Sequence, residues 1–290
     1  MSGGIDAALG FIIPGRNARG RIVRLGATLE TILSAHGYPP VIERLLAEAL
    51  TVTALLGVLL KDANGQLTLQ AQTEGGAVDL LVCDYRGGEL RGYVKHDAAA
   101  VAALPKEADL KALFGKGYLA ITFDQVTSGE RYQGIVPCEG ESLGAAVEHY
   151  FAQSEQIPSL VRIAVEGEVA GGLLVQHLAE GEEGRERLHT RLDHPEWEHV
   201  AILAGTIKAE ELTDAELPLE TIVWRLFNEE SEIRVLPVTD LSRGCRCDPA
   251  HIQEVIARFP EEERAAMMGE DGTIRVECEF CAKSFDVPPL

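Results

Sequence analysis

Cys245-Arg246-Cys247 and Cys278-Glu279-Phe280-Cys281 lie near the end of the chain and hold four of its six cysteines. The two pairs are separated by 30 residues, 248–277, without a further cysteine. Two cysteines with one or two residues between them can present both sulfurs to one point, and two such pairs form the tetrahedral set of a closed zinc site. The spacing is a variant of the paired zinc pattern, with one short arm and a longer loop. It predicts one Zn²⁺ per reduced chain, held by Cys245, Cys247, Cys278 and Cys281.

The same spacing has a consequence for oxidation. Cys245 and Cys247 are close enough in sequence for a disulfide, as are Cys278 and Cys281. Zinc would tie both ends of the 30-residue loop together, whereas two local disulfides would tie neither end to the other. A module of roughly 45 residues rarely buries enough surface to fold unaided. Oxidation would remove a staple worth on the order of 10 kcal/mol and restore little, so residues 241–290 are expected to unfold.

The segment before this module, residues 179–240, is predicted to be a helical linker. Residues 179–191 form a charged connector, and two amphipathic helices follow. The first is expected at 195–208, and the second is expected to begin at a capping box formed by 213–216. Their apolar faces need a partner. Two interpretations are open: two more helices of one fold, or a lid that docks on the preceding domain and can leave it. The lid residues are Trp197, Ile222, Val223, Trp224 and Phe227.

Residues 1–178 are expected to form an α+β domain with a large antiparallel or mixed sheet and packed helices. Apolar periodicity predicts mixed helix at 21–35 and longer helices at 41–60 and 142–151. Alternating or continuous apolar runs predict the strands, which are placed at 67–71, 78–82, 90–94, 118–123, 135–136 and 160–165. The remaining cysteines, Cys83 and Cys138, are expected in the core, where free cysteine usually lies.

Composition narrows the function. The 290 residues carry 46 acidic and 26 basic groups, a formal net charge of −20, which disfavours nucleic acid and anionic membranes as partners. No targeting segment or membrane-spanning run is apparent, so a cytosolic protein is expected, and there paired cysteines favour metal or redox chemistry over structural disulfides. No nucleotide-binding loop, nucleophile elbow or HExxH motif occurs. The sequence therefore presents no assembled catalytic site.

Several stretches resemble one known family. They are Gly117-Tyr118-Leu119-Ala120-Ile121-Thr122, Glu130-Arg131-Tyr132-Gln133-Gly134, Tyr150-Phe151-Ala152-Gln153-Ser154-Glu155-Gln156 and Ala170-Gly171-Gly172. Together with the two cysteine pairs, they resemble heat shock protein 33, the redox-regulated chaperone of the bacterial cytosol. The resemblance covers nearly the whole chain, and all four cysteines match.

The resemblance implies an ATP-independent holdase rather than an enzyme. It implies that the four cysteines hold zinc when reduced, that oxidation activates the protein, and that a metastable linker joins the N-terminal domain to the zinc module. Unfolding client proteins and, on activation, a second copy of the chain would be its partners. A cytosolic enzyme with a purely structural zinc site is the alternative. A nucleic-acid-binding zinc protein is a third interpretation, against which the net charge of −20 counts heavily.

Overall fold

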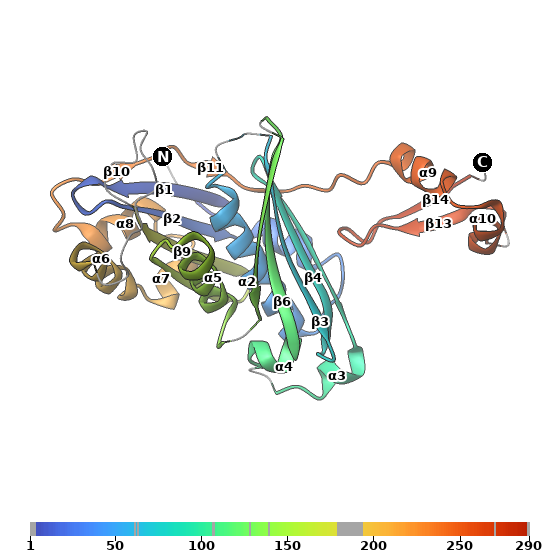
Figure 1. Cartoon of the computed structure of the whole chain (residues 1–290), viewed down its shortest axis with the longest axis horizontal. Helices are drawn as coiled ribbons and strands as arrows, with labels where there is room; N and C mark the ends of the chain where they lie inside the picture. Colours follow the sequence, from blue (N-terminus) through green and yellow to red (C-terminus); the bar gives the residue numbers. More distant parts are fainter. Residues whose placement is uncertain are drawn as a thin grey trace.

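The computed structural model describes residues 4–288 apart from 61, 63, 106–107, 128, 139, 179–193 and 270. The charged connector expected at 179–191 lies outside the described residues. The described part of the chain forms two six-stranded sheets, a two-stranded hairpin and the helices around them, so the expected α+β class is confirmed. Figure 1 shows the sheets beside each other, with a small C-terminal module projecting at one end.

The first sheet is built from three segments that are distant in the sequence, residues 7–25, 159–177 and 234–240. Its strands run in the order β10-β1-β2-β9-β8, and β11 also pairs with β1. All of these pairings are antiparallel. The strands are β1 (Ala7–Ile13), β2 (Ala18–Leu25), β8 (Ser159–Glu166), β9 (Val169–His177), β10 (Arg234–Val235) and β11 (Thr239–Asp240).

The second sheet has the order β12-β5-β4-β3-β6-β7, and its pairings are antiparallel except for the parallel pair β12–β5. Its strands are β3 (Gln66–Glu74), β4 (Val78–Arg86), β5 (Glu89–His96), β6 (Lys116–Gln125), β7 (Glu130–Pro137) and β12 (Ser242–Arg243). The helices before the linker are η1 (Pro14–Arg16), α1 (Ala27–Leu33), α2 (Pro40–Gly57), α3 (Ala98–Ala102), α4 (Leu110–Phe114), α5 (Leu143–Tyr150) and the π-helical turn η2 (Phe151–Glu155).

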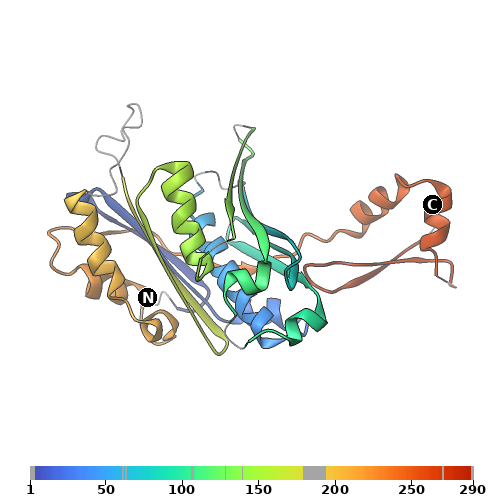
Figure 2. The same cartoon turned by 60° about the horizontal axis from the view of Figure 1, so that its bottom comes forward.

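Helix α2 lies between the two sheets and forms the centre of the larger core (Figure 2). Every residue from Ala49 to Gly57 is buried, so the later half of the helix is covered on all sides. Cys83 and Cys138 are buried in the same core, as expected. Burial raises the pKa of both thiols, to about 11 for Cys138, and the thiolate, which is the reactive form, is therefore disfavoured at each.

Two parts of the sheet prediction were wrong. The mixed helix expected at 21–35 is a strand up to Leu25, and only Ala27–Leu33 is helical. Strand β2 is flanked by β1 and β9 and is buried along its second half, and a short buried strand shows no period that separates it from a helix. Strand β9 was missed for a related reason. All eight positions after Val169 are buried, so the strand shows no alternation, and it contains Gly171 and Gly172, which are uncommon inside strands.

The linker helices cover the face of the first sheet that α2 leaves free. They are α6 (Pro195–Gly205), α7 (Ala209–Thr213) and α8 (Leu219–Phe227). A second apolar cluster forms at this face, in which Phe11 of β1 lies 5.6 Å from Phe227 between ring centroids. Trp197, Ile222, Val223 and Phe227 are all buried here.

Trp224 and the capping box differ from expectation. Trp224 is 62% exposed, because the apolar stripe of α8 consists of residues 219, 222, 223, 226 and 227, and a turn of about 100° per residue places residue 224 well away from it. Thr213 ends α7, and α8 starts after Pro218, so residues 213–216 do not begin the second helix. Half of such a motif occurs instead at the start of α7, where the Glu211 side chain accepts from the Lys208 backbone N–H.

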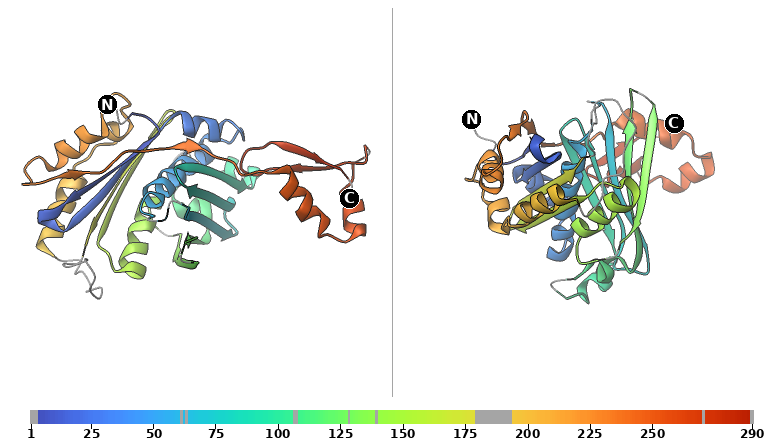
Figure 3. Two further views of the ribbon diagram at one scale, coloured as in Figure 1. Left: turned by 90° about the horizontal axis from the view of Figure 1, so that it is seen from above. Right: turned by 60° about the vertical axis from the view of Figure 1, so that its left-hand side comes forward.

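The C-terminal module contains α9 (Pro249–Ala257), α10 (Glu261–Met267) and the hairpin β13 (Ile274–Glu277) and β14 (Ser284–Val287). In the described part of the module, the buried apolar cluster consists of Ile256, Ile274 and Val287, with Ile252 and Val276 packed against them. A core this small contributes little to folding, which agrees with the expected need for a metal. Figure 3 shows the chain from α8 to α9 running the length of the molecule to reach this module.

Candidate metal centre

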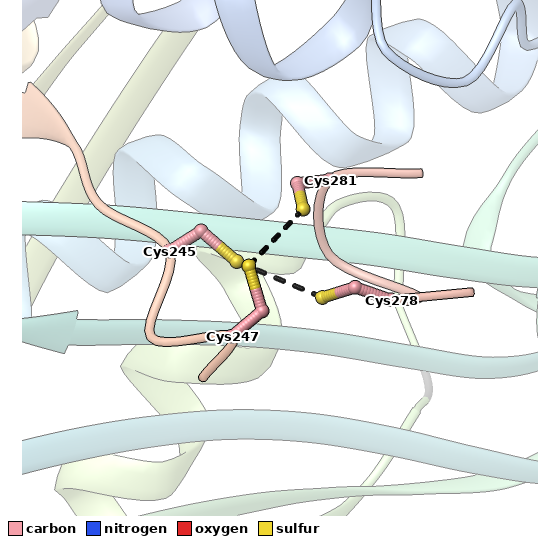
Figure 4. A group of neighbouring side chains, drawn as sticks. All are labelled: Cys245, Cys247, Cys278 and Cys281. Carbon is pink, nitrogen blue, oxygen red and sulfur yellow. Dashed lines mark hydrogen bonds between the residues drawn. The ribbon is translucent and has the colours of Figure 1, made fainter. Parts of the chain in front are cut away.

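The four cysteines predicted as metal ligands lie together at one point (Figure 4). Cys245 and Cys247 lie on the chain that follows β12, and Cys278 and Cys281 lie in the turn between β13 and β14. The Cys281 and Ala282 N–H groups donate to the Cys278 carbonyl, so the second pair sits in a tight turn. Ala282 adopts a φ of 51°, which turns the chain back into β14.

The sulfur positions fit a four-coordinate metal. All four sulfurs lie within 4.8 Å of one another. Cys245 Sγ lies 3.6 Å from Cys278 Sγ, and Cys247 Sγ lies 3.6 Å from Cys281 Sγ. A tetrahedron with Zn–S bonds of about 2.3 Å has sulfur–sulfur edges of about 3.8 Å. Each short distance joins one cysteine of the first pair to one of the second, so a shared metal would close the 30-residue loop.

The sulfurs also compete for protons. Burial raises the pKa of Cys245, but hydrogen bonds from the Cys247 backbone and from the other sulfurs outweigh burial and lower it to about 7. Burial and the neighbouring sulfurs raise the pKa of Cys247 to about 12 and also raise that of Cys278. Four thiolates cannot coexist here without a cation, because like charges at this separation repel. The donor set is therefore suited to a soft divalent ion such as Zn²⁺, which binds thiolate.

From this centre the chain leads back to the linker helices through the edges of both sheets. Strand β12, directly before Cys245, pairs with β5 of the second sheet. Strands β11 and β10 pair with β1 of the first sheet, and α8 precedes them. The 17 residues 228–244 thus separate the metal centre from α8, and the strands β10, β11 and β12 among them pair with the two sheets.

The linker helices are held by buried polar contacts as well as by apolar packing. The fully buried Arg24 of β2 donates to the backbone carbonyls of Glu211 (3.1 Å), Leu212 (3.0 Å) and Leu217 (2.7 Å). Burial lowers the pKa of its guanidinium. Gly171 of β9 permits this close approach, since a Cβ there would lie 2.2 Å from the Leu212 carbonyl oxygen.

A second polar cluster holds the N-terminal end of α6. Arg16 pairs with Glu196 of α6 and with Glu230, which follows α8. Glu230 also accepts from His199 of α6 at 2.7 Å, and its side chain is 6% exposed. Burial acts to raise the pKa of Glu230, but the bonds from Arg16 and His199 outweigh it and lower the pKa. Sequence reasoning missed Arg16 and Arg24, because an isolated arginine in a strand or turn carries no signal of its distant partners.

Replacing Arg24 tests this attachment. Arg24→Met keeps the length of the side chain but leaves three carbonyls without their donor, so we expect the free energy of unfolding to fall by about 2–3 kcal/mol. Hydrogen exchange across α7 and α8 should rise with it. Arg225→Met is the matched control, because Arg225 is half exposed and bonds Glu211 at the surface, where a pair contributes about 0–1 kcal/mol. Equal effects of the two substitutions would show that the Arg24 contacts do not hold the linker.

Comparison with known proteins places the chain in a family. A model of the Hsp33 protein family matches residues 6–288. A 33 kDa chaperonin of Caulobacter vibrioides is 40% identical over 296 residues, covering 98% of this chain and 95% of the relative. A 33 kDa chaperonin of Escherichia coli K12 is 35% identical over 271 residues, covering 92% and 87%.

The fold agrees with a solved structure. The 33 kDa chaperonin (heat shock protein 33 homolog) of Thermotoga maritima superposes with a TM-score of 0.78 at 20% identity, covering 98% of this chain and 95% of that one. In the part of the chain that the structure describes, no helix is long and apolar enough to cross a membrane. The two relatives and the nearly complete family match decide the assignment. This chain belongs to the Hsp33 family.

Proposed function

We propose that this chain is a chaperone, an ATP-independent holdase controlled by the redox state of Cys245, Cys247, Cys278 and Cys281. The names of its relatives support the chaperone role. The observation that carries the control mechanism is the continuous connection from the four sulfurs, through β12, β11 and β10, to helices that cover an apolar sheet face. A change at the cysteines can therefore act on that cover.

In the reduced protein one Zn²⁺ per chain would be held by the four thiolates and would close the C-terminal module. Residues 1–178 would act as the client-binding and dimerisation domain, 179–240 as the metastable linker, and 241–290 as the redox-switch domain. With the module folded, the linker helices stay on the first sheet and the apolar face beneath them is inaccessible. We assign the reduced state as inactive.

Oxidation would pair Cys245 with Cys247 and Cys278 with Cys281. Each disulfide would form as two thiolates give two electrons to one hydrogen peroxide, which takes up two protons and leaves as two water molecules. The metal ligands are then lost, and the module has too small a core to stay folded alone. The C-terminal anchor of the linker helices frays, and moderate heat can release helices whose docking is marginal. The uncovered face would bind unfolding proteins and a second copy of the chain. We place this activity in the cytoplasm, and it would involve neither nucleic acid nor a membrane. The protein would act by binding and would not catalyse a reaction.

Peroxide treatment at heat-shock temperature tests the proposal. We expect release of one zinc per chain, suppression of aggregation of an unfolded client without ATP, and peptide maps dominated by the two local disulfides. The same protein kept reduced at that temperature is the control and should retain zinc and bind the client weakly. A dominant long-range disulfide, such as Cys247 to Cys278, would keep the loop closed and contradict the mechanism. Chaperone activity that is equal before and after oxidation would also contradict it.

A further inference from the structure

The C-terminal module touches the rest of the molecule at the metal centre and stands away from it elsewhere (Figures 1 and 2). Before the first cysteine, the Gly244 N–H donates to the Leu90 carbonyl of β5 at 2.9 Å. Between Cys245 and Cys247, Arg246 donates to the Gln66 side chain of β3 at 2.6 Å. The third contact is made by Phe280, between the other two cysteines. The Phe280 backbone accepts a hydrogen bond from His36, and its ring contacts β5. Each of these contacts adjoins a proposed metal ligand.

Two side chains of β5, Arg91 and Tyr93, contact the ring of Phe280. Its ring lies 4.0 Å from the guanidinium carbon of Arg91, a cation–π distance. Tyr93 meets it edge to face, with 4.9 Å between centroids and 86° between planes. Edge-to-face pairs at this separation are favourable beyond the area they bury.

The platform beneath Phe280 is itself fixed. Arg91 donates twice to one oxygen of Asp84, from Nε at 2.8 Å and from Nη2 at 2.6 Å. Asp84 is 3% exposed, and its other oxygen accepts from Thr68 at 2.7 Å. The guanidinium plane is thus set by three strands of the second sheet, β3, β4 and β5. A ring placed on a fixed surface loses freedom of movement, and the turn that carries the ring loses it too.

We infer that Arg91 and Tyr93 are positioning residues of the metal centre: through Phe280 they hold the Cys278–Cys281 turn in place and slow the release of the metal. The inference rests on the proposed zinc binding. For the thiolates of Cys278 and Cys281 to leave a shared ion, the turn between β13 and β14 has to move, and Phe280 moves with it. The contacts with β5 must then break, so they add to the barrier. The second sheet thereby sets how readily the switch opens, although it supplies no ligand.

Zinc transfer from the reduced, full-length protein to an excess of chelator tests the inference. Tyr93→Ala and Phe280→Ala should each accelerate transfer by about two- to tenfold, from the range measured for aromatic pairs. The double variant should be no faster than Phe280→Ala, because both substitutions remove the same contact. Phe280→Tyr keeps a ring and should stay near the parent rate. Arg91→Lys keeps the charge beside Asp84 but loses the planar group, and an intermediate rate is expected.

Tyr118→Ala is the matched control, since Tyr118 is a 62% exposed tyrosine on β6 of the same sheet. Its transfer rate should equal that of the parent, and unfolding temperatures should confirm that all variants fold. An unchanged rate in Tyr93→Ala, or effects that multiply in the double variant, would overturn the inference while leaving the metal site intact. A parent protein that carries no zinc would instead refute the metal site itself, and this inference with it.

Discussion

Cys278→Ser is expected to abolish tight zinc binding and to unfold the C-terminal module while the protein is still reduced. Cys278 Sγ lies 3.6 Å from Cys245 Sγ, so its loss opens the tetrahedral set and separates the two ends of the loop. A structural zinc site contributes on the order of 10 kcal/mol. Among the described residues of the module, the apolar core holds three buried side chains. Metal analysis and hydrogen exchange over residues 249–288 would measure both effects.

The matched control is Cys138→Ser, which makes the same chemical change at a buried cysteine of the larger core, outside the cluster. It should retain one zinc per chain and a protected C-terminal module, although burying a hydroxyl in the core lowers overall stability. Full-affinity zinc in Cys278→Ser, or in a chain truncated before Gly244, would refute the four-cysteine assignment.

The four cysteines were predictable because their geometry is almost entirely local. Each pair spans three or four residues, and a metal site needs little more than two such turns that face each other. Local spacing cannot show the contacts of Phe280 with Arg91 and Tyr93, which are apparent only in the structure. Those partners lie nearly 190 residues earlier in the chain, and neither has a pattern that points to the other.

The same distinction holds for the fold. Helix α2 and the strands with alternating residues were predicted because one period dominates each. Strand β2 was predicted as helix, and strand β9 was not predicted. Both strands are covered on two faces, since α2 packs on one face of the sheet and the linker helices pack on the other. Gly172 lies against Thr51 and Leu55 of α2, and Gly171 lies against Leu212 of α7. The alternation that marks a half-exposed strand disappears where both faces are covered.

In helix α8 the buried face was predicted correctly, but one residue assigned to it, Trp224, lies elsewhere. The spacing of the apolar residues in α8 predicted the buried face, and Ile222, Val223 and Phe227 lie on it. Trp224 was included among the lid residues as a large apolar side chain, but it lies on the solvent side. Trp224 is already exposed while the helices are docked, so it cannot report their release. Only Trp197, at 8% exposure, can report release of the helices.

Phe227→Asp is expected to release the linker helices in the reduced, zinc-bound protein and to give it chaperone activity without oxidation. Phe227 is fully buried and packs on Phe11 of β1, so an aspartate would place a charge in the apolar cluster at a cost of about 4 kcal/mol or more. Docking of three short helices on one sheet face cannot absorb such a loss.

Trp224→Asp is the control, because it puts the same charge on the same helix at the exposed side. It should leave the helices docked and the reduced protein inactive. Trp224→Asp also removes one of the two tryptophans, so its fluorescence comes from Trp197 alone. A second version of Phe227→Asp that also carries Trp224→Phe has the same single tryptophan, and the two emission spectra can then be compared directly.

We expect a red shift of Trp197 emission, faster hydrogen exchange across 195–227 and binding of an unfolded client in the Phe227 variants alone, with zinc still bound. Release of the helices without a gain in client binding would show that the client surface lies elsewhere than on the first sheet. Client binding that rises while Trp197 stays buried would show that the helices are not the lid.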